Sequence, residues 1–165
     1  MQRVLVIGPC GAGKSTAARD LGARTGLPVI HLDQIYWQAG WVEPAPEEFA
    51  ARLDDALNGP AWIIDGNYGG SMDLRMGHAD ALVYLDFPIP LCLWRTVRRI
   101  WKYRGNSRPD VTEGCPERLD LSFLWYIACW PWTKRPALTR RVGSFAGQVH
   151  HFRSPAELQG WIDRL

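Results

Sequence analysis

The segment Gly8-Pro9-Cys10-Gly11-Ala12-Gly13-Lys14-Ser15-Thr16 follows the apolar run Val4–Ile7 and precedes the helix-favouring stretch Ala17–Leu21. It fits the pattern G-x-x-x-x-G-K-[ST] of a phosphate-binding loop, which requires a strand before it and a helix after it. Glycines let backbone N–H groups point toward phosphate oxygens, and the positive end of the following helix adds to the attraction. The sequence therefore predicts a phosphate-binding turn between a first strand and a first helix.

Two side chains of this loop have expected roles toward the phosphates of ATP. Lys14 is expected to reach the β- and γ-phosphates, and the Ser15 hydroxyl is expected to ligate Mg²⁺. Asp65 ends an apolar strand, which is where such proteins place a carboxylate that organises the metal. The alternative for Asp65 is a cap of the next segment.

Composition indicates one globular domain, residues 1–165, of 47% hydrophobic and 22% charged residues. No apolar run approaches the roughly 20 residues of a membrane span. The N-terminus reads directly as a strand, so we expect a cytoplasmic protein with no membrane partner. The four cysteines lack metal-ligand spacing and are expected to be free thiols.

Charge is unevenly distributed along the chain. Residues 1–85 hold 6 Lys/Arg against 10 Asp/Glu, and residues 86–165 hold 13 against 7, so the halves carry net charges of −4 and +6. A basic half beside an anion-binding half suits phosphate-rich ligands. It also suits nucleic acid, which stays open as a rival partner.

Apolar runs alternate with helix-favouring stretches throughout the chain. This alternation predicts an α/β fold, an open parallel sheet with helices on both faces. A polar, turn-rich segment, residues 104–118, is expected to be a mobile excursion that closes over the ligand, and we call it the lid segment. The expected strands are residues 3–7, 29–32, 61–64, 81–85 and 148–152, and the expected helices are 14–25, 43–58, 73–77, 90–103, 117–130 and a last one from 154.

Ligands of open parallel sheets bind beyond the carboxyl ends of the strands. Asp33, Asp65 and Arg153 follow strand ends, so we expect them on one rim with the phosphate loop. Asp33 is expected to position an acceptor hydroxyl, act as its base, or contact Mg²⁺ through water. A structural role in a turn is the alternative for Asp33.

Arg95 and Arg99 are four residues apart on an expected helix, so both side chains leave the same face. Guanidinium groups suit phosphate oxygens, and a transferring phosphoryl group needs positive charge around it. A solvated basic helix face is the alternative. Five tryptophans in or next to this helix and the expected helix 117–130 should pack between the two helices. They are Trp94, Trp101, Trp125, Trp130 and Trp132.

An acceptor segment, about residues 33–60, contains further candidate binding residues. Trp37 and Trp41 follow the second strand, and Tyr68 follows the third. They are expected either to stack on a planar acceptor such as a base or to fill the core. The histidines, His31 included, receive no role.

Several motifs resemble the nucleoside monophosphate kinases, adenylate kinase above all. They are the loop Gly8–Thr16, Trp62-Ile63-Ile64-Asp65-Gly66, and Leu85-Asp86-Phe87-Pro88 followed by Arg95 and Arg99. Other motifs resemble adenylate-kinase-related proteins labelled "DNA topology modulation protein". These are His31-Leu32-Asp33-x-x-Tyr36-Trp37-x-x-Gly40-Trp41, Asp65-Gly66-Asn67-Tyr68 and Gly114-Cys115-Pro116-Glu117-Arg118.

The resemblance implies a P-loop NTPase fold: a three-layer α/β/α sandwich with a five-stranded parallel sheet of order 2-3-1-4-5 and a short helical lid. It implies ATP on the loop, Asp65 near Mg²⁺, Arg95 near the adenine, Arg99 on the phosphates and Arg153 at the adenine edge. Adenylate kinases carry Asp-Gly-Phe-Pro-Arg where this chain has Asp65-Gly66-Asn67-Tyr68-Gly69. Arg75 is the candidate to replace the missing arginine toward the acceptor.

These observations predict a Mg²⁺-dependent phosphotransferase that passes the γ-phosphate of ATP to a nucleoside, nucleotide or similar small acceptor, as a monomer or homodimer. The alternative is an ATP-binding regulator or DNA-associated protein, supported by the basic tract Arg95–Arg108. A plain NTPase is a third hypothesis, and an acceptor other than water distinguishes it from a kinase.

Overall fold

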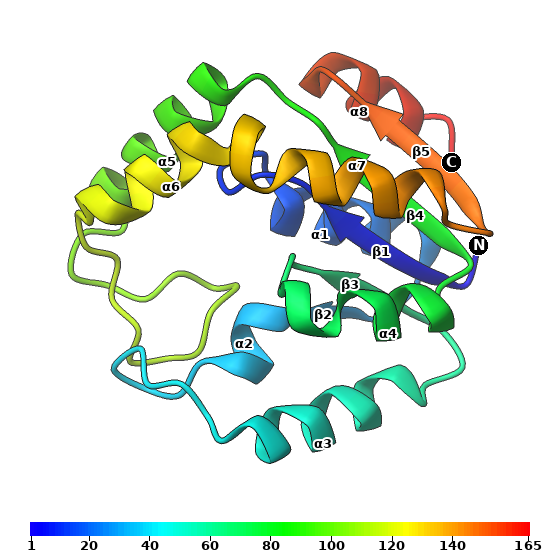
Figure 1. Cartoon of the computed structure of the whole chain (residues 1–165), viewed down its shortest axis with the longest axis horizontal. Helices are drawn as coiled ribbons and strands as arrows, with labels where there is room; N and C mark the ends of the chain where they lie inside the picture. Colours follow the sequence, from blue (N-terminus) through cyan, green and yellow to red (C-terminus); the bar gives the residue numbers. More distant parts are fainter.

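A computed structural model, which describes residues 1–165, contains a five-stranded sheet with helices on both faces (Figure 1). The strand order is β2-β3-β1-β4-β5, and every pairing is parallel. The expected fold class and strand order are therefore confirmed. The strands are β1 (Arg3–Ile7), β2 (Val29–His31), β3 (Trp62–Asp65), β4 (Ala81–Leu85) and β5 (Gln148–Phe152).

Eight α-helices surround the sheet, and one turn of 3₁₀ helix, η1 (Gly69–Ser71), precedes the fourth of them. No helix combines the length and the apolar character needed to cross a bilayer. The helices are α1 (Lys14–Thr25), α2 (Leu32–Tyr36), α3 (Pro46–Leu57), α4 (Met72–His78), α5 (Ile89–Lys102), α6 (Leu121–Thr133), α7 (Arg135–Gly143) and α8 (Pro155–Ile162).

The core lies on both faces of the sheet because side chains of a strand alternate between its two faces. On β1, Val4 and Val6 pack in one cluster with residues of α1 and α8. Leu5 and Ile7 pack in the other cluster with residues of α3, α4 and α7. The continuous apolar runs of the sequence are therefore those of strands that are covered on both faces.

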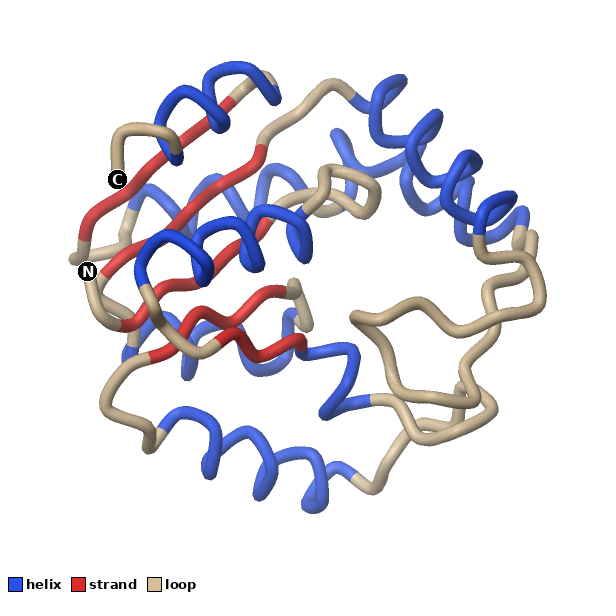
Figure 2. Tube along the Cα trace, turned by 180° about the vertical axis from the view of Figure 1, so that it is seen from behind, coloured by secondary structure: helices blue, strands red, loops and turns tan.

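The carboxyl ends of the strands face a cluster of loops, while both chain termini lie at the opposite end of the sheet (Figures 1 and 2). Helices α5 and α6 pack side by side beyond the carboxyl ends. The lid segment joins them, and it lies beside the loop that follows α2 (Figure 2). The central strand β1 thus delivers the phosphate loop to the middle of this end.

The structure corrects several expected boundaries. Helix α6 begins at Leu121, not near residue 117, because the Asp120 carboxylate caps it by accepting hydrogen bonds from Ser122 N (2.9 Å) and Phe123 N (3.2 Å). The lid segment contains no helix, so the expected helical lid is wrong. Glycines and prolines interrupt that segment throughout, which prevents a helix. The short helices α2 and α7 were not predicted.

Of the five tryptophans expected to pack between α5 and α6, one is buried and four are exposed. Trp130 is buried among core residues. Four others are largely exposed: Trp94 (57%), Trp101 (80%), Trp125 (72%) and Trp132 (78%). They lie on the sides of α5 and α6 that face away from the sheet, because the opposite sides carry the buried residues Thr96 and Ile127.

Candidate active site

The phosphate loop turns tightly between β1 and α1 and depends on its glycines. Gly8, Gly11 and Gly13 have φ values of 145°, 82° and 93°. A Cβ atom on Gly8 would lie 2.3 Å from the carbonyl oxygen of Leu85, and one on Gly11 would lie 2.1 Å from that of Cys92. Only glycine fits at these positions, since side chains are excluded both by the backbone conformation and by the ends of β4 and α5.

The polar side chains of the loop point into its concave side. Lys14 Nζ donates hydrogen bonds to the carbonyl oxygens of Gly8 and Pro9, both at 3.1 Å. Ser15 Oγ donates to Asp65 Oδ2 at 2.7 Å. The sheet explains this last contact, because Asp65 is the residue of β3 that pairs with Val6 at the end of β1.

Asn67 ties the loop after β3 to the phosphate loop. Its Nδ2 donates to the Gly8 carbonyl oxygen at 2.7 Å, and its Oδ1 accepts from the Gly8 N–H at 3.2 Å. Neither of these hydrogen bonds of Asn67 was predicted from the sequence. These two hydrogen bonds fix Gly8, the first glycine of the phosphate loop, to the loop that follows β3.

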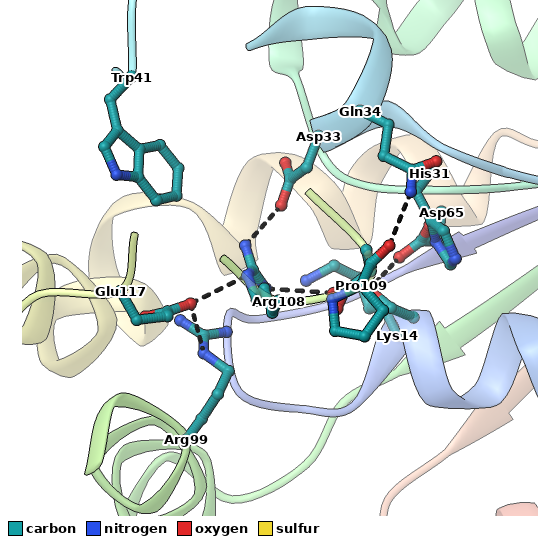
Figure 3. Close-up of polar contacts among 12 residues, drawn as sticks. Lys14, His31, Asp33, Gln34, Trp41, Asp65, Arg99, Arg108, Pro109 and Glu117 are labelled. Carbon is teal, nitrogen blue, oxygen red and sulfur yellow. Dashed lines mark hydrogen bonds and ion pairs between the residues drawn. The ribbon is translucent and has the colours of Figure 1, made fainter. Parts of the chain in front are cut away.

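His31 is a further buried residue of the site that sequence reasoning missed. It ends β2 and pairs in register with Asp65 on β3. Its Nδ1 lies 2.5 Å from Asp65 Oδ1, and both side chains are buried (Figure 3). The position of His31 at the end of a strand could have indicated this contact, since neighbouring parallel strands place their last residues together. Asp65 is thus held from one side by Ser15 and from the other by His31.

A cleft of about 1140 Å³ runs along the carboxyl ends of the strands. It extends from α8, over the phosphate loop, to the loop after α2 and to the side of α6 and α7 that faces the sheet. The predicted residues that line it together are Cys10, Gly11, Ala12, Gly13, Lys14, Ser15, Thr16, Asp33, Trp37, Trp41, Asp65, Tyr68, Arg95 and Arg99. The shared rim expected from the strand ends is therefore present.

Arg75 does not line the cleft, although it was expected to contact the acceptor. It is fully buried, and its guanidinium donates to the carbonyl oxygens of Gly66 (2.9 Å), Asn67 and Tyr68 (3.1 Å). Burial lowers the pKa of Arg75 to about 10. The side chain holds the loop after β3, in which Tyr68 has a positive φ of 29°. The burial of Arg75 could not be predicted from the sequence, because it depends on tertiary contacts and arginines are usually exposed.

Arg153 also lies outside the main cleft. Its backbone N–H donates to Glu157 Oε2 at 2.9 Å, and its side chain lines a separate small pocket beside Asp86, Trp130 and Arg135. On the side of the phosphate loop nearest β5, the main cleft is lined by Pro155, Leu158 and Gln159 of α8. The end of β5 therefore contributes through α8, one turn later in the chain than expected.

Asp33 lies in the first turn of α2, with its carboxylate in the cleft. Tyr68 Oη donates to Asp33 Oδ1 at 2.7 Å. Arg108 lies 2.9 Å from Asp33 Oδ2 (Figure 3). Burial raises the pKa of Tyr68, and the charge of Asp33 raises it further, so the hydroxyl stays protonated and donates. Trp37, Trp41 and Tyr68 line the same cleft as Asp33, and the Trp37 and Trp41 rings lie 5.4 Å apart, edge to face.

Two arginines on α5 approach the phosphate loop, as their spacing predicted. Arg95 donates from one terminal nitrogen to the Ala12 carbonyl oxygen at 3.1 Å, and it lies 5.8 Å from the centre of the Phe87 ring. Arg99 Nε forms an ion pair with Glu117 Oε1 at 3.1 Å. Burial lowers the pKa of Arg99, and the positive charge of Arg108 lowers it further.

The lid segment brings Arg108 into the cleft among three carboxylates. Besides Asp33, its guanidinium contacts Asp110 Oδ2 (3.2 Å) and Glu117 Oε1 (2.9 Å). Burial of Arg108 works against its charge, but Asp33, Asp110 and Glu117 outweigh burial and raise its pKa. The sequence places Arg104, Arg108 and Arg118 at this segment, but spacing could not show which of them enters the cleft, since turns set no regular spacing.

The lid segment is docked onto residues 34–41 by hydrogen bonds from Pro109 to Pro116. It therefore forms one covering over the cleft together with the start of the acceptor segment. The bonds join Gln34 Nε2 to Pro109 O (2.8 Å), Thr112 Oγ1 to Trp37 O (2.6 Å), Cys115 Sγ to Gln38 O (3.2 Å), Gly40 N to Gly114 O (2.8 Å) and Trp41 Nε1 to Pro116 O (3.0 Å).

The residues present fit ATP with Mg²⁺. The phosphate loop offers a glycine-lined concavity with Lys14 in it, and Ser15 with Asp65 supplies two oxygen ligands side by side. The structure contains no cluster of three or more His, Cys, Asp or Glu side chains suited to a metal ion. Magnesium is usually bound by one or two protein oxygens together with substrate phosphates and water, so a two-oxygen site suits it.

Sequence comparison identifies the relatives of this chain. A shikimate kinase from Halorhodospira halophila is 31% identical over 138 residues, which covers 74% of this chain and 74% of that protein. The chain belongs to the family of P-loop kinases that includes shikimate kinase. A putative adenylate kinase from Pyrococcus furiosus is 25% identical over 117 residues, 70% of this P-loop kinase and 63% of the relative. No protein-family model matches the chain.

Solved structures support the same fold. The shikimate kinase from Bacteroides thetaiotaomicron aligns with this P-loop kinase with a TM-score of 0.54 and 17% identity, over 99% of this chain and 95% of that one. The shikimate kinase from Acinetobacter baumannii, solved in complex with shikimate, aligns with a TM-score of 0.58 and 19% identity, over 99% and 90% of the two chains. The expected P-loop kinase fold is therefore confirmed.

Proposed function

We propose that this P-loop kinase is a Mg²⁺-dependent phosphotransferase that passes the γ-phosphate of ATP to a hydroxyl group of a small acceptor. The observation that carries the proposal is the position of Asp33, whose carboxylate shares one cleft with Lys14 and Ser15 of the phosphate loop. A phosphate-binding loop alone indicates only nucleotide binding. A positioned carboxylate beside it adds the group that a hydroxyl acceptor requires.

The donor half of the site consists of the phosphate loop, Lys14 and the arginines of the cleft. Backbone N–H groups of the loop and Lys14 bind the phosphates, while Arg95, Arg99 and Arg108 bring positive charge to the transferring group. Ser15 and Asp65 would hold Mg²⁺, which would supply positive charge to neutralise the phosphates.

The acceptor half of the site is built around Asp33. In the transfer, the acceptor hydroxyl oxygen forms a bond to the γ-phosphorus while the bond from that phosphorus to the β,γ-bridging oxygen breaks. ADP leaves with the bridging oxygen, and the hydroxyl proton passes to the Asp33 carboxylate. The contacts of Tyr68 and Arg108 orient this carboxylate in the cleft.

The walls of the cleft near Asp33 indicate what kind of acceptor fits. Trp37 and Trp41 line the cleft, and elsewhere it is lined by Lys134, which lies between α6 and α7, and by Arg141 of α7. Aromatic walls suit a ring, and cationic walls suit a carboxylate or phosphate on it. The relatives are named for shikimate and adenylate kinase activities, so hydroxylated ring acids, nucleosides and nucleotides come first among the candidates.

The proposal is tested by measuring ADP release with ATP and Mg²⁺ in the presence of nucleosides, nucleoside monophosphates, hydroxy acids including shikimate, and small alcohols. Phosphorus NMR then identifies the phosphorylated product. We expect one acceptor class to accelerate ADP release, and Lys14→Ala to abolish it while the melting temperature stays within a few degrees. ADP release that no acceptor changes, or a fully active Lys14→Ala protein, would contradict the proposal.

A second candidate function, ATP-regulated binding of nucleic acid, has one observation in its favour. The outward side of α5 carries exposed Trp94 and Trp101 beside exposed Arg98 and Lys102. Aromatic and basic side chains together bind single strands, through base stacking and phosphate contacts. A single-stranded oligonucleotide should then quench tryptophan fluorescence at low salt, with an affinity that falls steeply as salt rises. No quenching at low salt rejects this function.

A further inference from the structure

Glu117 is a buried carboxylate that the proposed transfer does not use. It lies near the end of the lid segment and is 6% exposed. Its Oε1 atom lies 3.1 Å from Arg99 Nε and 2.9 Å from Arg108 Nε (Figure 3). The two arginines come from different elements, α5 and the lid segment, and both line the cleft. Glu117 is therefore the single link between them.

The backbone at Glu117 is fixed to the start of the lid segment. Its N–H donates to the Asn106 carbonyl oxygen at 3.0 Å, and its own carbonyl oxygen accepts from Gly105 N at 3.3 Å. These bonds close the base of the lid segment directly after α5. The side chain of Glu117 thus starts from an anchored position, and its direction into the cleft is set by the fold.

In the two ion pairs Glu117 lies closest to Nε of each arginine and not to the terminal nitrogens. Both contacts are at ion-pair distance but without hydrogen-bond geometry, so each guanidinium keeps its two terminal nitrogens for other partners. For Arg108 these nitrogens contact Asp33 and Asp110. An Arg fork binds phosphate oxygens best when its orientation is already set, because less side-chain freedom is then lost on binding.

The negative charge of Glu117 also reduces the repulsion between the two arginines. Two guanidinium groups at close range repel each other, and one buried carboxylate between them removes part of that repulsion. Arg108 is also held by Asp33 and Asp110, whereas Glu117 is the one ion-pair partner of Arg99. Without Glu117, Arg99 would lose that partner and the repulsion from Arg108 would act on it unopposed.

We propose that Glu117 is a positioning residue that holds Arg99 and Arg108 together in the orientation that the transferring phosphoryl group requires. This inference rests on the proposed kinase function. In the proposed transfer Glu117 takes no part in bond making or breaking and acts through the two arginines. It also joins the position of the lid segment to that of α5.

The first test is Glu117→Gln, which keeps the size of the side chain and removes its charge. We expect kcat to fall about 10- to 100-fold, since a small misplacement of transition-state contacts has effects of that size. The dissociation constant for ATP should change less than about threefold, because the phosphate loop and Lys14 remain. Glu113→Gln is the matched control, because Glu113 is exposed in the same lid segment. Unchanged kcat in Glu117→Gln overturns the proposal.

A double-mutant cycle separates positioning from a general structural role. If Glu117 acts through the arginines, Glu117→Gln should cost less than about threefold in kcat when Arg99 and Arg108 are already alanine. The same full loss in that background overturns the proposal. Glu117→Asp, which retains the charge, should recover part of the activity and serves as the test variant if Glu117→Gln fails to fold.

A readout that needs no catalysis keeps this inference distinct from the proposed function. Amide hydrogen exchange of residues 104–118, measured with a non-hydrolysable ATP analogue bound, should be about tenfold faster in Glu117→Gln than in the wild type. Equal exchange in the two proteins overturns the positioning role. If the wild type phosphorylates no acceptor but exchange still differs, the proposed function fails while the link made by Glu117 stands.

Discussion

The Asp65 carboxylate joins two residues that are distant in sequence, with His31 Nδ1 2.5 Å from Oδ1 and Ser15 Oγ 2.7 Å from Oδ2. Each oxygen of the carboxylate therefore has one fixed neighbour. Such outer contacts orient a metal-binding carboxylate and keep it from rotating when the metal leaves. His31 at the end of β2 therefore helps to orient the Asp65 side chain at the end of β3.

His31→Ala should weaken magnesium binding without removing either proposed ligand. Loss of an outer contact of this kind typically costs 10- to 100-fold in metal affinity. We expect the Mg²⁺ concentration for half-maximal ADP release to rise by about tenfold or more. His78→Ala, at the end of α4, is the control, because His78 does not line the cleft. An unchanged magnesium requirement in His31→Ala would show that Asp65 needs no support from β2.

Gly11→Ala should destabilise the protein, because the added methyl group has no room. Its Cβ would lie 2.1 Å from the Cys92 carbonyl oxygen and 2.5 Å from Thr96 Oγ1, at a φ of 82°. Overpacking and a left-handed backbone together cost about 2–4 kcal/mol. Urea unfolding measures the loss. Gly77→Ala, at an open helical position in α4, is the control and should be neutral or slightly stabilising.

Tyr68→Phe should impair turnover more than stability. It removes the hydroxyl that donates to Asp33 at 2.7 Å and leaves the ring in place. We expect kcat to fall about tenfold as Asp33 loses its orientation, with a loss of about 1 kcal/mol in the free energy of unfolding. Tyr36→Phe is the control, because the Tyr36 ring touches Tyr68 with centroids 4.5 Å apart. Equal kcat values for the two variants would argue against orientation of Asp33 by Tyr68.

Asp86→Asn should destabilise the protein in a pH-dependent way. Burial raises the pKa of Asp86, but Arg135 (2.6 Å) and His151 (3.3 Å) outweigh burial and hold the pKa below its usual value. A depressed carboxyl pKa stabilises the fold above the unfolded value of about 4, and this contribution disappears as pH falls below it. We therefore expect a loss of about 1 kcal/mol at pH 7, since Arg135 is half exposed, and a smaller loss at pH 3.

The measurement for Asp86 is urea unfolding of the wild type and the variant at both pH values. Asp163→Asn is the control, because the Asp163 carboxylate is exposed and lies 3.5 Å from Arg24. A loss for Asp86→Asn that is the same at pH 7 and pH 3 would assign the effect to packing or hydrogen bonding, not to charge.

Local chemistry explains which parts of this molecule were predictable. The turn from β1 into α1 follows from its glycines and Lys14, because a phosphate loop needs those residues at those spacings. The sheet followed from continuous apolar runs between turn residues, and its strand order from the resemblance to adenylate kinases. The face shared by Arg95 and Arg99 followed from helical spacing. Apart from the strand order, each of these depends on residues close together in the chain.

The missed features depend on contacts between residues far apart in the chain. Arg75 is buried beneath a loop, His31 meets Asp65 across two strands, and Glu117 pairs with two arginines. The start of α6 was misplaced because Asp120 provides a better cap than any residue near 117. Hydrophobicity alone also misled, since four tryptophans of α5 and α6 are exposed.

The docking of the lid segment onto residues 34–41 has a kinetic consequence. Because hydrogen bonds join the lid segment to residues 34–41, the two should open together, so in the proposed kinase the ATP and acceptor sites would become accessible at the same time. An acceptor that arrives after closure must wait for the whole covering to lift. Steady-state kinetics should then show sequential addition with strong substrate inhibition when one ligand is in large excess, and release of the covering should limit turnover.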